Sequence, residues 1–266
     1  MSKQYSTTWK KPPLIANAYL RYGLVLASIV YLILATQSVH INWLRIYEGA
    51  ERGWAFVLAF MSPDFTGRWN NISQGLVESL TMTLTSTVAG VLLSIPFGLG
   101  AAKNIAPKPV YLFCRGFVAV ARSFQEIIIA ILCVALFGFG TFAGFVTLTF
   151  ATIGFLAKLF ADEIEAIDPA PLTAMRATGA SWLQQINYAV QAQVMPRFIG
   201  LSMYRLDINF RESAVIGIVG AGGIGATLNT AMDRYEYSAA AAILLIIIAI
   251  VMVCEYVSTL IRQRVQ

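Results

Sequence analysis

The sequence predicts an all-α integral membrane protein with about six transmembrane helices. Of its 266 residues, 58% are hydrophobic and only 12% are charged, whereas soluble domains carry roughly 25% charged residues. The apolar residues gather in continuous runs instead of alternating with polar ones. Runs of about 20 apolar residues are typical of spanning helices, and the lack of alternation argues against a membrane β-barrel.

Six apolar segments are expected to span the membrane, because a helix satisfies its own backbone amides where no water is present. In chain order they are residues 22–37, 75–102, 111–137, 142–160, 197–216 and 238–260. Residues 1–21 form a polar N-terminal segment without the features of a cleavable signal peptide. Residues 38–74 are expected to form an outer loop, and residues 22–266 as a whole a transmembrane domain whose core helices lie in residues 75–266.

The distribution of basic residues predicts that both termini lie in the cytoplasm. In that orientation most lysines and arginines outside the spans face the cytoplasm, and the outside keeps only Arg45, Arg52, Arg68 and Arg234. An excess of Lys and Arg in the cytoplasmic loops is the usual signature of membrane topology.

The polar segment 162–196 is unusual in such an apolar chain, and it is expected to be cytoplasmic. Pro169 and Pro171 favour the start of a helix over residues 170–178. Gly179 permits a left-handed turn, and Ser181 can cap a second helix over residues 182–194. Two short helices at an angle fit a groove on a partner, whereas the alternative is a plain solvated loop. The residues expected to dock are Asp168, Ala174, Met175, Arg176, Gly179, Ala180, Ser181 and Trp182.

The fifth span is rich in polar residues, and charges inside a span usually face a cavity or a partner. Asp207 and Arg211 are four residues apart and can pair. Guanidinium groups bind phosphate-like oxyanions through two hydrogen bonds, so a translocation path is one interpretation. An ion-pair network that holds subunits together is the other. The candidate path residues are Arg205, Asn209, Arg211 and Glu212, together with Arg122 of the third span.

The second span is rich in hydroxyl groups, and it also contains Glu78. We expect these residues to make interhelical hydrogen bonds in preference to binding a substrate. The hydroxyl-bearing residues are Ser79, Thr81, Thr83, Thr85, Ser86 and Thr87.

A glycine-rich segment follows the fifth span, with glycines at 220, 222, 223 and 225. Its spacing fits the dinucleotide fingerprint, but that fingerprint requires a βαβ unit. We therefore expect Gly220, Gly222, Gly223 and Gly225 to form part of an outer gate, with a plain turn as the alternative.

The chain lacks the residues of a soluble ATPase or hydrolase. It has no G-x-x-x-x-G-K-[ST] sequence, so it cannot hydrolyse ATP through a P-loop. Its single histidine and its three scattered cysteines give no catalytic set and no metal spacing. We expect no enzyme activity and no cofactor in this chain.

Several segments resemble permeases of the phosphonate ABC importer family. They are residues 94–98 (SIPFG), 101–104 (AAKN), 165–169 (EAIDP), 176–181 (RATGAS), 193–196 (QVMP) and 217–225 (GIVGAGGIG). The resemblance covers residues 75–266, and Thr173 stands where the general docking pattern of importer permeases has Glu. It implies the type I ABC importer permease fold in a bacterial inner membrane.

The resemblance also implies a function and a set of partners. Two permease subunits, often identical, pair with two cytoplasmic ATPase subunits that bind ATP and Mg²⁺, and with a periplasmic or lipid-anchored binding protein. The expected cargo is a phosphonate or a related oxyanion such as phosphite, hypophosphite or phosphate, with no role for nucleic acid. The alternatives are an ABC permease for methionine or an osmoprotectant, an ATP-independent carrier or channel, and a membrane scaffold.

Overall fold

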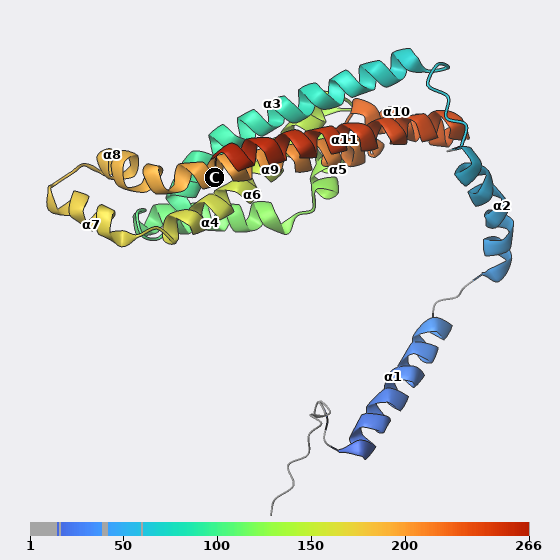
Figure 1. Ribbon diagram of the computed structural model, residues 1–266, viewed down its shortest axis with the longest axis horizontal. Coiled ribbons are helices and arrows are strands. Elements are labelled where there is room, and N and C mark those ends of the chain that lie inside the picture. Colours follow the sequence, from blue (N-terminus) through green and yellow to red (C-terminus); the bar gives the residue numbers. More distant parts are fainter. Residues whose placement is uncertain (1–14, 16, 39–41, 60, 266) are drawn as a thin grey trace, which may run out of the picture. The chain divides into compact units, whose positions relative to one another are not determined.

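The computed structural model describes residues 15, 17–38, 42–59 and 61–265, and the regular elements of these residues are helices (Figure 1). The chain divides into two compact units, residues 1–55 and 56–266. The first unit holds α1 (Ala18–Ser38) and most of α2 (Trp43–Ala59). Helix α1 is apolar on all sides and buries none of its residues, as expected of a helix surrounded by lipid.

The second unit is an elongated helical bundle. Its elements are α3 (Trp69–Ala101), α4 (Lys108–Ser123), α5 (Glu126–Phe137), α6 (Thr141–Glu165), α7 (Pro169–Ala177), α8 (Trp182–Gln185), the π-helical turn η1 (Ile186–Val190), α9 (Gln191–Ile218), α10 (Gly223–Asp233) and α11 (Tyr237–Val265). Helices α7 and α8 lie at one end of this unit and α10 lies towards the other (Figure 1). We call these the elbow end and the glycine end.

The centre of the bundle is the contact between α3 and α6, which small residues bring close together. A Cβ atom added to Gly90 of α3 would collide with the side chain of Thr152 on α6. At Gly98 an added Cβ would collide with the ring of Phe160. Small residues allow helix backbones to approach in membrane proteins, where dispersion contacts replace the hydrophobic effect as the main source of stability.

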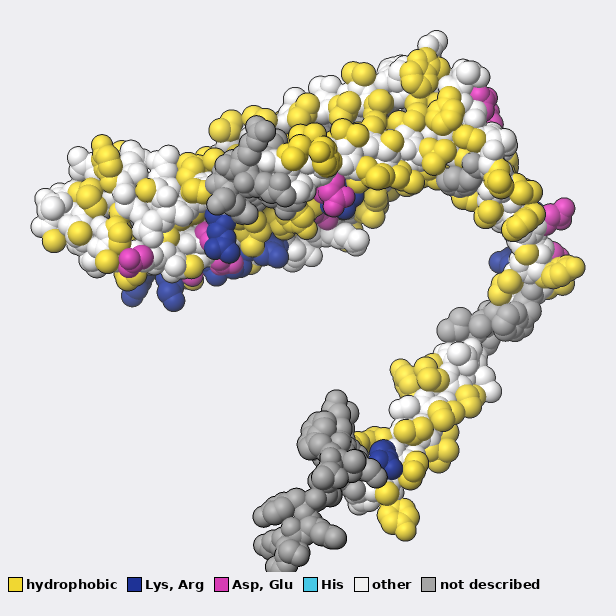
Figure 2. Space-filling view, viewed as in Figure 1, with side chains coloured by type: hydrophobic (Ala, Val, Ile, Leu, Met, Phe, Trp, Pro, Cys, Tyr) yellow, Lys and Arg dark blue, Asp and Glu magenta, His cyan; other side chains and the backbone are white. Residues whose placement is uncertain are grey.

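The elbow end carries most of the basic side chains of the second unit, and Figure 2 shows dark blue groups gathered near α4 and α7. Several are neutralised by the C-terminal turns of α6. Arg115 lies 3.7 Å from both Asp162 and Glu165, and Lys158 pairs with Asp162. A charged, solvated end beside a mainly apolar bundle surface is the pattern expected where helices leave a membrane.

The glycine end is closed by contacts between the start of α3 and the start of α11. Arg68 holds Glu236 through two contacts, at 2.5 Å and 2.7 Å, and the backbone N–H of Asp64 donates to the carbonyl of Ser238 at 3.1 Å. Hydrogen bonds from the backbone N–H of Gly67 and then from Thr66 lower the pKa of the Asp64 carboxyl below its usual value.

The expected number of spans is confirmed. Among the residues that the structure describes, five helical segments are long and apolar enough to cross a membrane, and the bent pair α4 and α5 would make a sixth. The third predicted span, residues 111–137, was expected to be continuous, but α4 and α5 meet at 93°. Phe124 and Gln125 are extended there. No proline or glycine marks the break, which instead allows Glu126 to reach Arg205 of α9.

Three further boundaries differ from those expected. The predicted loop 38–74 contains α2 and the first turn of α3, because residues 43–59 form an amphipathic helix. The second docking helix continues through η1 into α9, and Pro196 lies inside α9. A membrane helix can tolerate a proline, because neighbouring groups satisfy the carbonyl that loses its N–H partner. Residues 223–233 form the additional helix α10, which glycine content had obscured.

Candidate functional site

The elbow consists of α7, the turn 178–181 and α8. Asp168 caps α7 by accepting a hydrogen bond from the backbone N–H of Ala170 at 2.9 Å, and Pro169 begins the helix. Gly179 has a φ of 72° and ends α7, with the N–H of Ala180 bonded to the carbonyl of Met175. Ser181 and Gln184 form a capping box at α8. These features confirm the helix–turn–helix that the sequence predicted.

The elbow is attached to the bundle through three sets of contacts. Leu172 is buried in the core at this end, and the backbone N–H of Asp168 donates to the side chain of Gln193 at 3.0 Å. The third set reaches the α3–α4 connection. Arg176 donates to the carbonyl of Asn104 at 2.9 Å, and the indole N–H of Trp182 donates to that of Ile105 at 3.1 Å.

The predicted docking residues therefore divide by exposure. Ala174, Gly179 and Ser181 are exposed on the outer surface of the elbow, whereas Met175 and Ala180 are half-buried. Arg176 and Trp182 are exposed in part, but their polar groups point to the α3–α4 connection. A docking role for any of these residues stays a prediction.

A polar network lies inside the bundle and joins four helices. Asn209 is fully buried and donates to Thr87 of α3 at 2.8 Å and to Thr152 of α6 at 2.9 Å. The Nε of Arg205 donates to the same Thr152 hydroxyl at 3.2 Å. Arg205 is only 2% exposed, and its guanidinium lies 3.5 Å from Glu126 at the start of α5. We call these five residues the core network.

The core network explains why a buried arginine is tolerated. An unpaired buried charge is very costly, but pairing and hydrogen bonds compensate for lost water. The guanidinium also lies over the ring of Phe155, 5.2 Å from its centre, where the face of an aromatic ring attracts a cation.

The other candidate path residues occupy different surroundings. Arg211 pairs with Asp207 at 2.6 Å, as predicted from their spacing, and its own side chain is about half exposed. Glu212 is half-buried. Arg122 is exposed and is the penultimate residue of α4, before the bend, whereas Glu126 begins α5 after it. The structure therefore brings Arg205 and Asn209 together without Arg122, and the path role of all five stays a prediction.

The glycine end is built around a tight turn between α9 and α10. Gly220, Gly222 and Gly223 all have positive φ values, from 74° to 95°, a region that other residues rarely adopt. A Cβ atom added to Gly225 would collide with the carbonyl of Ala214. These glycines allow α10 to fold back against α9, and a gating role for them remains a prediction.

Two residues of α3 cap the first turn of α10. The carboxylate of Glu78 accepts from the backbone N–H of Gly223 at 3.2 Å, and the Ser79 hydroxyl accepts from the N–H of Ile224 at 2.9 Å. With the bond from Asn209 to Thr87, this confirms the expected interhelical hydrogen bonds for Glu78, Ser79 and Thr87, whereas Thr85 and Ser86 bond to carbonyls of α3 itself. The partners could not be identified from sequence, because Asn209 and Gly223 are more than 100 residues away along the chain.

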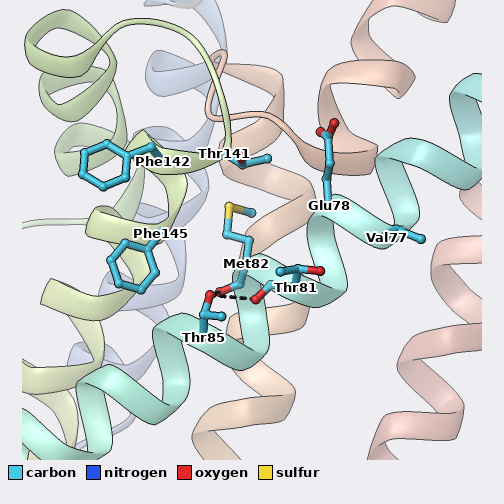
Figure 3. A pocket seen from close by; sticks show the side chains of 8 residues that line it. All are labelled: Val77, Glu78, Thr81, Met82, Thr85, Thr141, Phe142 and Phe145. Atoms are coloured by element: carbon cyan, nitrogen blue, oxygen red, sulfur yellow. Dashed lines mark hydrogen bonds between the residues drawn. The ribbon is translucent and has the colours of Figure 1, made fainter.

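A cavity of about 350 Å³ lies beside Glu78, between α3 and the start of α6. Figure 3 shows Phe142 and Phe145 of α6 on one side and Thr81 and Thr85 of α3 on the other. The Thr85 hydroxyl is already bonded to the Thr81 carbonyl at 2.7 Å. The cavity is mixed in character, and sequence reasoning did not identify it because its walls come from helices far apart in the chain.

Comparison with known proteins gives a consistent result. Residues 94–266 match the family described as binding-protein-dependent transport system inner membrane component. The chain is 35% identical over 245 residues to the phosphate-import permease protein PhnE of Mycolicibacterium smegmatis, covering 92% of this chain and 46% of that protein. It is 39% identical over 205 residues to the phosphite transport system permease protein PtxC of Stutzerimonas stutzeri, covering 77% and 74%. The chain thus spans about half of the first relative and three quarters of the second.

Solved structures share the fold. The chain matches the methionine ABC transporter MetNI in an inward-facing conformation with a TM-score of 0.65, at 22% identity, over 73% of this chain and 96% of that chain. An amino acid ABC transporter matches with a TM-score of 0.60 at 18% identity, over 85% of this chain and all of the other. At this identity the likeness concerns the fold alone, which is that of type I ABC importer permeases, as predicted.

Proposed function

Since the chain belongs to the family of binding-protein-dependent transport inner membrane components, we propose that it is the permease subunit of an ABC importer for a small phosphorus oxyanion. The cargo is a phosphonate, phosphite or phosphate. The observation that carries this choice is that the relatives more than 30% identical to the chain have names that refer to phosphate, phosphite and phosphonate transport. The permease works in a bacterial inner membrane with both termini in the cytoplasm.

The energy comes from other proteins. The chain has no P-loop, so two cytoplasmic ATPase subunits bind ATP and Mg²⁺ and dock on the exposed surface of the elbow. A binding protein delivers the ligand at the glycine end. Two identical permease copies form the pore, and closure of the ATPase dimer moves their elbows and opens the path to the outside.

The oxyanion passes the polar residues of α9. Arg211 is half-exposed, whereas its partner Asp207 is buried. The Arg211 guanidinium can therefore bind a phosphorus oxyanion at the surface of α9, without the anion entering the protein interior. Arg205 is already engaged by Thr152 and Glu126, and it contributes positive potential along the path. The turn 219–222 and α10 form the outer gate.

The test is reconstitution of the permease in liposomes with the ATPase and binding protein that co-purify with it. We expect vanadate-sensitive, ATP-dependent uptake of at least one of three probes, namely methylphosphonate, phosphite and phosphate. Arg211→Gln should reduce uptake while the assembled complex still forms. If the complex takes up methionine but none of the three probes, the chain is instead the permease of a methionine importer. Absence of any ATPase partner in several detergents would favour an ATP-independent carrier.

A further inference from the structure

The elbow is bonded to the α3–α4 connection, a segment far from it in the chain. The chain joins the elbow to the bundle at its two ends, through residues 166–168 and through α8 into η1, and Leu172 of α7 packs into the core. A short element held mainly near its two ends can still tilt about the line that joins them. Contacts with a third, separate segment remove that freedom, and residues 104 and 105 are this segment.

The third attachment is made by two side chains and two backbone carbonyls. Arg176 comes from α7 and bonds to the carbonyl of Asn104, 72 residues earlier in the chain. Trp182 comes from α8 and bonds to the carbonyl of Ile105, 77 residues earlier. Each helix of the elbow thus contributes one bond, and the two acceptors are consecutive residues.

The receiving segment is itself fixed to the bundle. The side-chain amide of Asn104 donates to the carbonyl of Ile164 in the last turn of α6 at 2.7 Å. The neighbouring backbone N–H of Lys103 donates to Glu165 at 3.0 Å. The Ile105 side chain packs against the same buried cluster as Met175 of the elbow. A load applied at Arg176 or Trp182 therefore reaches α3 and α6 directly.

We propose that Arg176 and Trp182 are bracing residues, which lock the elbow to the α3–α4 connection so that force from the ATPase moves the whole bundle. This inference rests on the proposed function and separates two tasks within the predicted docking residues. The exposed surface around Ala174, Gly179 and Ser181 receives the ATPase. Arg176 and Trp182 act on the other side of the elbow, as positioning residues that turn docking into transport.

The test compares ATPase binding, ATP hydrolysis and uptake in the reconstituted complex. Trp182→Phe keeps the ring and removes the indole N–H, and Arg176→Met keeps the aliphatic stem and removes the donors. We expect each variant to bind ATPase like the wild type and to hydrolyse ATP. Uptake per ATP should fall about fivefold in Trp182→Phe, the effect of one lost hydrogen bond. It should fall at least as much in Arg176→Met, which also loses the bond from Arg176 to Gln185 of α8. The matched control is Trp54→Phe in α2, which is also exposed but belongs to the other compact unit, and it should leave all three quantities unchanged.

Three results would overturn the inference. If both variants show the same uptake per ATP as the wild type, the bonds from Arg176 and Trp182 do not contribute to coupling. Loss of ATPase affinity in step with uptake would make both residues docking contacts. Failure of the wild type to bind any ATPase would remove the proposed function, and with it this inference. Thermal melting of each variant identifies a folding defect. Arg176→Lys keeps a hydrogen-bond donor on a shorter side chain, so its uptake per ATP should lie between that of Arg176→Met and that of the wild type.

Discussion

Gly179 offers a clean test of the elbow because its role depends on backbone conformation alone. Its φ is 72°, and an added Cβ atom would meet no heavy atom within 4 Å. In Gly179→Ala the left-handed conformation costs about 1–2 kcal/mol. The smaller entropy of the unfolded chain offsets this by about 0.4–1 kcal/mol. The net cost of about 1 kcal/mol reduces the stability of the turn roughly fivefold.

The stability of the turn can be measured at the backbone N–H of Ala180, which is bonded to the carbonyl of Met175 at 3.2 Å. Hydrogen exchange should show about fivefold lower protection there in Gly179→Ala, more than that in Gly179→Val, and little change in Gly179→Asn, since Asn tolerates left-handed φ. ATP-dependent uptake should follow the same order. Gly116→Ala on α4 is the matched control, because Gly116 also has open space but a helical φ. Unchanged protection and uptake in Gly179→Val would refute the reasoning.

The remaining predictions concern the bundle and its glycine end. Gly225→Ala should destabilise the protein by about 1–3 kcal/mol through overpacking against the Ala214 carbonyl of α9, seen as a lower melting temperature in detergent; melting like the wild type would mean that α10 packs elsewhere. A double-mutant cycle of Asn209→Leu with Thr87→Val should give a coupling energy of about 0.6 kcal/mol and up to about 1.7 kcal/mol, whereas additivity would contradict the buried bond. Arg68→Glu or Glu236→Arg alone should lower the melting temperature, and the combined swap should restore most of it.

The sequence predicted what is local to a segment. The apolar runs fixed the number of spans, since length and hydropathy alone decide whether a helix can cross a membrane. The start of α7 and the turn of the elbow were predicted nearly residue by residue, because Pro169, Gly179 and Ser181 act through their own backbone neighbourhoods. The pair Arg211 and Asp207 followed from a spacing of four residues.

What the sequence did not predict depends on contacts between distant segments. The break at Phe124 has no proline or glycine, and it places Glu126 beside Arg205, 79 residues away. Thr152 was not singled out because a threonine in an apolar span looks like any other packing residue until Asn209 and Arg205 are seen to share its hydroxyl. Helix α10 was missed because glycine lowers helix propensity, whereas here α3 supplies the caps from outside the segment.

The close packing of α3 against α6 bears on the mechanics of the subunit. Gly90 and Gly98 bring α3 so close to α6 that an added Cβ atom would meet Thr152 or Phe160, so we expect this pair of helices to resist rotation and sliding. A pair of helices interlocked in this way behaves as a rigid lever, with one arm ending near the elbow and the other near the turn beside α10. A small displacement at one end must then appear at the other as a change of tilt. In the two-copy importer proposed above, we therefore expect the compliant joint to lie between the copies and not within either one.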